Sequence, residues 1–105
     1  MVRQIIWTER AQKERIEILT FWNNRNKSVV YSKKLNALLK ESLQLICKYP
    51  LIGKLTNKDN VRIKIVNDYL IIYEITKDKI VVLSIWDCRK NPEDLERIIH
   101  YTPRL

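Results

Sequence analysis

Glycine, cysteine and histidine are scarce in this sequence, and each shortage excludes a class of functional site. The single glycine, Gly53, leaves no glycine-rich loop that could cradle a phosphate. The two cysteines, Cys47 and Cys88, have neither metal-ligand spacing nor a disulfide framework, so we expect two reduced thiols. With His100 as the only histidine, a zinc site is not expected. The sequence therefore predicts a protein without metal or cofactor.

Long apolar runs are missing as well. No stretch approaches the roughly 20 apolar residues of a membrane-spanning helix, and the apolar segment near the N-terminus is too short for a secretory signal. We therefore expect a cytoplasmic protein that does not enter a membrane. With 105 residues, of which 46% are hydrophobic, the chain is large enough for one core, so a single domain over residues 1–105 is predicted.

Positive charge is what the chain has in excess. Its 20 lysines and arginines outnumber 12 acidic residues and give a formal net charge of +8. Such an excess in a small domain predicts an anionic partner, which is a nucleic acid, an acidic protein or a membrane surface. Charge alone does not choose among these partners, so the choice depends on how the basic residues are arranged.

The N-terminal half is typical of a short strand followed by two helices. Residues 2–7 predict the strand, and Thr8 is suited to cap a helix that runs to about residue 24. Ser28 is the expected cap of a second helix, which Pro50 ends because the residue before a proline avoids helical geometry. The residues expected to face inward are Ala11, Ile18 and Trp22 on the first helix and Tyr31, Leu35, Leu38, Leu39, Leu43, Leu45, Ile46 and Tyr49 on the second, while Lys13, Glu14 and Glu17 should face outward.

The second half is typical of an antiparallel meander. Residues 61–66 and 69–76 are two predicted strands, separated only by Asn67 and Asp68, which tolerate the left-handed backbone of a tight hairpin turn. A two-residue loop fixes the register of the hairpin. The expected pairs are Val66 with Tyr69, Lys64 with Ile71 and Arg62 with Tyr73.

A third strand should follow the turn at Lys77 and Asp78 and pair Tyr73 with Val82 and Tyr69 with Trp86. One face of the meander would then carry Arg62, Lys64, Tyr69, Ile71, Tyr73, Val82, Ser84 and Trp86. The opposite face is almost wholly aliphatic, and a helix layer is expected to cover it. Cations beside aromatic rings suit a phosphate backbone or an acidic peptide. The alternative is that this face is a second packed layer, with the long Arg and Lys side chains reaching past it to water.

Two further features complete the predicted fold. Gly53 lies in the connection after the second helix, where a positive φ is expected. Residues 91–94 combine a cap, a proline and acidic residues, so a short third helix should run to about residue 100. The predicted class is α+β, in which an N-terminal strand and a helix hairpin pack on one face of an antiparallel β-meander with a short C-terminal helix.

Basic residues are the remaining candidates for a functional site, because the sequence contains no conventional hydrolase motif. The meander could gather five cations at one end of the sheet: Lys54, Arg62, Lys64, Arg89 and Lys90. Such a set could hold a phosphate and stabilise the charge that develops during RNA strand transfer without a metal. The spacing of two puts Arg62 and Lys64 on the same face, whereas lone surface lysines such as Lys54 and Lys90 are more often merely solvated.

The order of strand, helix hairpin and meander resembles the RelE/ParE family of type II toxin–antitoxin toxins. The motifs that carry the resemblance are P-x-x-G, V-R-I-K-I-V-N-D-Y-L-I-I-Y-E-I and I-V-V-L-S-I-W-D-C-R-K-N-P, and together they extend it over nearly the whole chain. The resemblance implies a small basic toxin that arrests growth and contributes to plasmid stabilisation. It also implies an acidic or amphipathic antitoxin that wraps the toxin, so that the two form a hetero-oligomer.

The family divides by target. In the branch similar to RelE, which cleaves mRNA on the ribosome, basic residues match Arg62, Lys64 and Arg89. That branch also has an arginine just after the hairpin turn, where this chain has Leu70, and a tyrosine in the C-terminal helix, near Leu95. The branch similar to ParE, which poisons DNA gyrase, needs no nuclease constellation. The two leucines therefore slightly favour gyrase as the target.

Several alternatives stay open at this point. Tyr69, Tyr73 or the pair His100 and Tyr101 could replace the missing nuclease groups, since some ribosome-dependent relatives use a C-terminal histidine and tyrosine. The residues expected to bind nucleic acid or a protein partner are Lys54, Tyr69, Trp86 and Lys90, and the antitoxin is expected on the helix hairpin and on the meander near Arg62 and Arg89. A third hypothesis is a non-toxic basic nucleic-acid-binding domain, whose affinity would fall steeply with salt.

Overall fold

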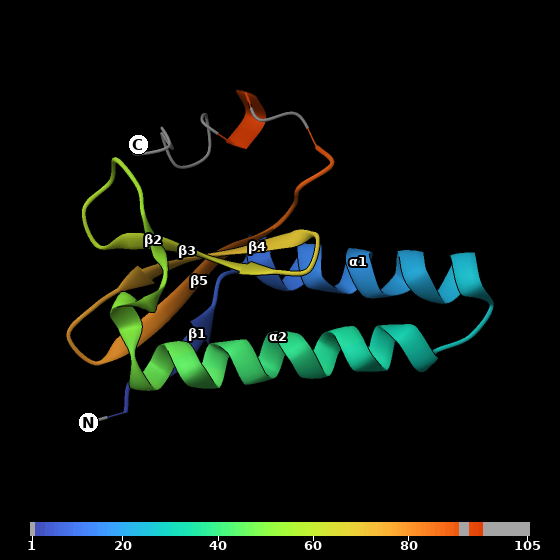
Figure 1. Ribbon diagram of the computed structural model, residues 1–105, viewed down its shortest axis with the longest axis horizontal. Coiled ribbons are helices and arrows are strands. Elements are labelled where there is room, and N and C mark those ends of the chain that lie inside the picture. The colour runs from blue at the N-terminus through green and yellow to red at the C-terminus, as the bar shows by residue number, and fades with distance from the viewer. Residues whose placement is uncertain (1, 91–92, 96–105) are drawn as a thin grey trace.

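Two long helices pack on a five-stranded sheet in the part of the chain that the structure describes. The structure is a computed structural model and describes residues 2–90 and 93–95. The helices are α1 (Glu9–Asn26) and α2 (Val30–Lys48), and a short 3₁₀ helix, η1 (Pro50–Ile52), follows α2. The strands are β1 (Gln4–Trp7), β2 (Lys54–Leu55), β3 (Val61–Val66), β4 (Tyr69–Ile75) and β5 (Lys79–Asp87). Both helices lie on one side of the sheet (Figure 1), which confirms the predicted α+β class.

The sheet is mixed and has the strand order β1-β5-β4-β3-β2. Strands β2 to β5 are antiparallel neighbours, as in the predicted meander, whereas β1 runs parallel to β5. The short strand β2 was not predicted. Residues 93–95 are helical and lie on the side of the sheet opposite the helix hairpin (Figure 1), and the rest of the predicted C-terminal helix lies outside the described residues.

The register of the β3–β4 hairpin agrees with the prediction. Asn67 has the positive φ, 52°, that the tight turn requires. The confirmed pairs are Val66 with Tyr69, Lys64 with Ile71 and Arg62 with Tyr73, and the pair of Tyr73 with Val82 is confirmed between β4 and β5.

A bulge in β5 changes the register beyond that last pair. Leu83 has no partner in β4, so it is the additional residue of the bulge. Tyr69 therefore lies opposite Asp87, and its predicted pairing with Trp86 is wrong. One additional residue moves every later side chain of the strand to the other face of the sheet. Trp86 therefore lies on the face opposite Tyr69, although the two were expected to share a face.

The helix layer covers the opposite face from the one expected. The main core lies between the helices and the sheet face that carries Tyr69 and Tyr73, so this face is interior rather than a basic binding surface. The rings can be buried because their hydroxyls have partners, Trp22 for Tyr69 and Pro50 for Tyr73. The fully buried members of this core include Ala11, Leu35, Leu39, Leu43, Ile46, Ile71, Ile80 and Val82. The alternative of a second packed layer is thus the correct one.

A second apolar cluster fills the aliphatic face of the sheet. Its buried members are Val61, Ile63, Ile72, Trp86 and Leu95, with Leu70 and Leu83 packed against them. Leu95 belongs to the segment of residues 93–95, so this segment supplies the cover that the helix hairpin was expected to give. The sheet is therefore apolar on both faces, with α1 and α2 on one face and the short helical segment of residues 93–95 on the other.

Helix α1 begins as predicted. The Thr8 hydroxyl accepts from the amide of Ala11 at 3.1 Å and caps the helix. Ala11 is buried, and Ile18 and Trp22 pack against the main core. The helix continues two residues past the expected end, to Asn26, and the left-handed Lys27 follows it. The inward face of α1 is thus confirmed.

Helix α2 differs from the prediction at its start. The N-cap is Val29, one residue after Ser28, although the Ser28 hydroxyl still accepts from the amide of Val30 at 3.2 Å. The helix ends at Lys48, just before Pro50, as expected. Its predicted apolar stripe is only partly buried, because Leu38, Leu45 and Tyr49 are exposed.

Gly53 is required for space rather than for an unusual backbone. Its φ is −70°, so the expected positive φ is wrong. A Cβ atom at this position would lie 2.9 Å from Cε1 of Tyr73 and 3.0 Å from Cβ of Arg62. The backbone after η1 can therefore approach β3 and β4 closely only without a side chain.

Candidate functional site

Arg62 lies near the β2 edge of the sheet, where its guanidinium holds the connection between α2 and β2. Nη1 donates to the carbonyls of Leu51 at 3.0 Å and Gly53 at 2.9 Å. The side chain is half-buried on β3. A group that donates to two main-chain carbonyls acts first as a structural clamp, and a phosphate would have to compete with these bonds.

The buried side chain of Tyr73 also holds the connection between α2 and β2. Its hydroxyl donates to the carbonyl of Pro50 at 2.6 Å and accepts from the amide of Gly53 at 3.0 Å. Burial raises the pKa of this phenol, and the hydrogen bond from Gly53 and the charge of Arg62 oppose the shift only in part. Tyr73 is fully buried, so the structure places this candidate nuclease residue in the core.

Tyr69 is likewise interior, at the other end of β4. Its hydroxyl accepts from Nε1 of Trp22 at 2.7 Å, and only 1% of the residue is exposed. Burial is the main cause of its raised pKa. The bond joins the turn end of the sheet to the second half of α1, so Tyr69 positions the helix against the sheet.

Arg89 is an exposed cation at this end of the sheet, and it forms an ion pair with Asp87. Nε and Nη2 donate to the two carboxylate oxygens of Asp87 at 2.9 and 2.8 Å, while 52% of the arginine side chain remains exposed. The guanidinium carbon lies 5.7 Å from the ring centres of both Phe21 and Trp22. The hydrogen bonds from Arg89 hold the pKa of Asp87 below its ordinary value. Nη1 and the second hydrogen of Nη2 remain available to a ligand.

A pocket opens beside this ion pair, between α1 and the end of β5. Its apolar residues are Ile18, Phe21, Tyr69 and Ile85, and its charged residues are Glu14, Glu17, Asp87, Arg89 and Lys90. Lys90 also lies 5.7 Å from the ring of the buried Trp86. An apolar floor with charges of both signs at the rim suits an amphipathic protein segment.

The five predicted cations form two groups rather than one. Arg62 and Lys54 lie on the neighbouring strands β3 and β2, and Lys64 lies opposite Ile71 in the middle of the sheet. Arg89 follows β5 at the far end. Val82, which is level with Tyr73 and Arg62, precedes Asp87 by several residues, so at about 3.3 Å per residue the two arginines are more than about 10 Å apart along the strands.

The resemblance to the nuclease branch leads one to expect an arginine in place of Leu70 and a tyrosine near Leu95. Both leucines belong to the aliphatic-face cluster, in which Leu95 is 5% exposed and Leu70 packs from its edge. Trp86, which was expected on a binding surface, is buried in the same cluster. The remaining candidates, His100 and Tyr101, lie outside the described residues.

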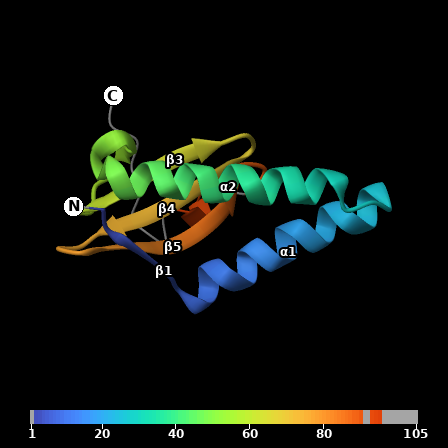
Figure 2. The same cartoon turned by 90° about the horizontal axis from the view of Figure 1, so that it is seen from below.

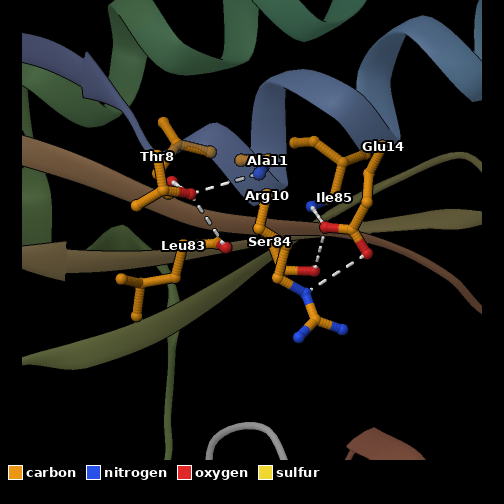
Figure 3. A network of polar contacts seen from close by, with 8 residues as sticks. Thr8, Arg10, Ala11, Glu14, Leu83, Ser84 and Ile85 are labelled. Atoms are coloured by element: carbon orange, nitrogen blue, oxygen red, sulfur yellow. Dashed lines mark hydrogen bonds and ion pairs between the residues drawn. The ribbon is translucent and has the colours of Figure 1, made fainter.

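Glu14 makes polar contacts with β5 that the sequence did not predict, because this residue was expected to face outward. Oε1 accepts from the Ser84 hydroxyl at 2.7 Å and from the Ile85 amide at 3.3 Å, and Oε2 lies 3.6 Å from Nε of Arg10 (Figure 3). The Thr8 hydroxyl donates to the Val82 carbonyl at 2.8 Å in the same region. The polar Ser84 in an apolar strand was the available signal for this contact.

The described part of the chain contains neither a membrane-spanning helix nor a metal-binding cluster. No helix in residues 2–90 and 93–95 is both long and apolar enough to cross a membrane. Within the same ranges, no three histidine, cysteine, aspartate or glutamate side chains are grouped so that they could hold a metal ion. The candidate site therefore consists of the ion pair, the aromatic residues around it and the adjoining pocket.

The fold is shared with a solved toxin–antitoxin structure. A chain of the chromosomal ParDE TA system from P. aeruginosa superposes with a TM-score of 0.68 over 82% of this chain and 96% of that chain, at 12% sequence identity. No curated protein sequence matches the chain. At that identity the structural likeness shows a common fold.

The family model described as "ParE toxin of type II toxin-antitoxin system, parDE" matches residues 5–92. The chain therefore belongs to the ParE toxin family, and the resemblance seen in its motifs is confirmed. As a ParE-type toxin of a type II system, it has a cognate antitoxin as its partner.

Proposed function

We propose that this toxin arrests growth by binding DNA gyrase, without chemistry of its own, until the antitoxin covers it. The observation that carries the proposal is the packing of Leu70 and Leu95 in one apolar cluster. A nuclease of the RelE type would need charge and a proton-transfer group at these two places. The two leucines instead bury apolar surface between the sheet and residues 93–95, which stabilises the fold.

The charge at Arg89 supports a protein target as well. The scissile phosphate of an mRNA is a phosphodiester with one negative charge, and it binds best where positive charge is in excess. The Asp87–Arg89 pair is neutral as a unit, and its neighbours in the pocket include Glu14 and Glu17. Such a pocket is better matched to mixed side chains of a protein surface than to the scissile phosphate of an mRNA.

The test is a pair of reconstituted assays on the free toxin, supercoiling by purified gyrase and mRNA cleavage on programmed ribosomes. The variant is Arg89→Ala, and the matched control is Arg25→Ala, which removes an exposed arginine from the last turn of α1. We expect inhibition of supercoiling, intact mRNA, and a loss of inhibition with Arg89→Ala only. Cleavage of mRNA that Arg89→Ala abolishes would overturn the proposal and establish the endoribonuclease hypothesis.

The hypothesis of a non-toxic nucleic-acid-binding domain predicts a different result in the same assays. A basic nucleic-acid-binding domain would inhibit neither gyrase nor translation at physiological salt. Its binding to RNA and DNA would fall with a steep salt slope. Growth arrest on expression without antitoxin would contradict that hypothesis.

A further inference from the structure

The end of the helix hairpin carries positive charge without any acidic residue. Between Glu17 and Glu41 the chain has five basic residues and no aspartate or glutamate, although the whole chain has 20 basic and 12 acidic residues. The five are Arg25, Lys27, Lys33, Lys34 and Lys40, and all of them are exposed. Within the described residues none of the five forms an ion pair. This end of the molecule is therefore a positive patch that no acidic side chain compensates.

The hairpin tip, residues 23–34, projects beyond the sheet. Figure 1 and Figure 2 show, in two perpendicular views, that the last turns of α1 and the first turns of α2 reach past the β3–β4 turn. Four of the five basic residues belong to this tip. The tip can therefore touch a large partner while the sheet stays clear of it.

Polar groups of the tip hold it in shape. The hydroxyl of Ser32, a residue that is only 6% exposed, bonds to the Asn23 side chain and lies 3.0 Å from the carbonyl of Val29. Lys27, in the left-handed conformation with a φ of 49°, donates its amide to the carbonyl of Asn23. The main chain that carries the cations is thus ordered before a partner arrives, which lowers the ordering cost of binding.

The start of α2 departs from the usual charge pattern of a helix. The positive end of the helix dipole lies there, so acidic residues in the first turn are stabilising and cations are not. Helix α2 has no acidic residue in its first turn, and its N-cap, Val29, makes no side-chain cap hydrogen bond. Lys33 and Lys34 are instead the fourth and fifth residues of the helix. A local conflict of this kind is expected at a functional site, and here it concentrates positive charge.

We propose that the hairpin tip binds the phosphate backbone of duplex DNA, as an activity separate from the pocket beside Arg89. Proteins hold DNA phosphates with Arg and Lys, with Ser and Asn side chains, and with helix N-termini. The exposed donors of the tip, beside the start of α2, are Asn24, Arg25, Asn26, Lys27, Ser28, Lys33 and Lys34. All of these side chains can donate hydrogen bonds, and phosphate oxygens accept them.

Single-stranded nucleic acid fits the tip less well. Proteins hold unpaired bases by stacking them on aromatic rings. The one aromatic residue in the sequence of the tip is Tyr31, and its ring packs edge-on against Trp22 with the ring centres 4.8 Å apart. A duplex needs no such platform, because its bases are already stacked on each other.

Of the two duplexes, DNA matches the projecting tip better than RNA. The major groove of B-form DNA is about 12 Å wide and admits a helix, whose diameter with side chains is about 10–12 Å. The major groove of duplex RNA is too deep and narrow for side chains to read. Val29 and Val30, which are 48% and 61% exposed at the tip, would meet thymine methyl groups in the DNA groove.

An anionic membrane surface is the alternative occupant. Helices that lie in such a surface expose Trp, Phe or Leu on their apolar side. The exposed apolar side chains of the tip are the two smaller valines, and polar residues precede and follow them in the sequence. The tip therefore offers a membrane little apolar surface to bury.

The test is fluorescence anisotropy of a labelled DNA duplex of about 20 base pairs, two helical turns, titrated with the free toxin at several salt concentrations. The tip variant is Lys33→Gln with Lys34→Gln. The matched control is Lys58→Gln with Lys77→Gln, which removes two exposed lysines from the loops before β3 and β5, at the other end of the sheet. Both double variants have the same net charge, so they separate a located contact from diffuse attraction.

We expect the tip variant to lose affinity for the duplex by about tenfold or more at low salt and the control by less than about twofold. The salt slope of the tip variant should become shallower by about 1.8, since each lost phosphate contact accounts for about 0.9. Equal losses in the two variants would overturn the proposal. Tighter binding of the wild-type toxin to duplex RNA, to single strands or to vesicles with anionic lipid, at the same salt, would also overturn it.

Thermal unfolding separates loss of binding from loss of structure. Glutamine forms helices about as well as lysine, and the tip variant removes two cations from the positive end of the α2 dipole. Its melting temperature should therefore equal or exceed that of the wild type. A tip variant that unfolds at a lower temperature than the control would overturn the assignment of Lys33 and Lys34 as binding residues.

The duplex titration contains no gyrase, so it stands apart from the proposed target. If the wild-type toxin does not inhibit supercoiling, gyrase fails as the target while the titration still decides whether the tip binds DNA. A toxin that inhibits supercoiling but loses no duplex affinity on substitution of Lys33 and Lys34 would overturn the tip proposal and leave the target intact.

Discussion

The hydroxyl of Tyr73 donates to the carbonyl of Pro50, 23 residues earlier in the chain, at 2.6 Å. This bond ties the end of the helix hairpin to the centre of the sheet. The same oxygen accepts from the amide of Gly53, so one buried side chain satisfies a carbonyl at the start of η1 and an amide just after it. The connection between α2 and β2 is thereby held in place.

Tyr73→Phe should lower the free energy of unfolding by about 1–3 kcal/mol, because it leaves the carbonyl of Pro50 and the amide of Gly53 buried without a partner. Urea unfolding measures the change, which should appear as a lower midpoint with an unchanged slope. The control is Tyr49→Phe, since Tyr49 is exposed. Equal effects of the two substitutions would contradict the role given to the hydroxyl.

Gly53→Ala should destabilise the protein, by about 1–3 kcal/mol. A φ of −70° is open to alanine, and at such positions the substitution normally stabilises by about 0.4–1 kcal/mol. Here the new Cβ would overlap Tyr73 and press on Arg62, so the sign reverses. Chemical denaturation gives the sign directly, and a stabilised Gly53→Ala variant would show that the chain relaxes around the methyl group.

Glu14→Ala should cost about 1–3 kcal/mol, since it removes the acceptor of the Ser84 hydroxyl and the Ile85 amide. Glu14→Gln keeps an acceptor oxygen and should cost less. Glu17→Ala, on the same helix but exposed, should change stability by no more than about 0.5 kcal/mol. Urea unfolding of the three variants is the measurement, and an effect of Glu17→Ala as large as that of Glu14→Ala would rule the explanation out.

The Asp87–Arg89 pair should make stability fall in acid. Because the folded pKa of Asp87 is depressed by Arg89, the pair contributes stability above the unfolded pKa of about 3.9, and this contribution is lost as the pH falls through the folded pKa. Melting temperatures of wild type and Asp87→Asn should differ at pH 7 and converge once the pH has fallen below the folded pKa of Asp87. A difference that persists unchanged in acid would mean that Asp87 acts through packing alone.

The β3–β4 hairpin could be predicted because its signal is local. Asn67 and Asp68 form the turn because both residue types tolerate a left-handed backbone. The two-residue turn then fixes every pair of the hairpin. The bulge at Leu83 has no such local signal. It lies where the carboxylate of Glu14, distant in sequence, meets Ser84 and Ile85. A contact between distant segments accompanies this change of register, and a single sequence does not display such a contact.

The candidate site was harder to predict for a similar reason. Strand alternation correctly placed Arg62 on the same face as Tyr73, but alternation says nothing about which face the helices cover. The helices cover the face with the tyrosines because Trp22 and the main chain around Pro50 meet both hydroxyls. Arg89 was predicted as one of five cations near one end of the sheet and again from the resemblance, whereas its neutralisation by Asp87 follows from geometry beyond the strand end.

The parallel pairing of β1 with β5 places the first strand beside the last described strand. The Thr8 hydroxyl, for example, reaches the carbonyl of Val82 across 74 residues of sequence. A ribosome releases Thr8 long before Val82, so the emerging chain carries an incomplete sheet for most of its synthesis. We therefore expect a nascent toxin to be harmless until translation is nearly finished, and an antitoxin already present in the cell to meet it at the moment when it folds.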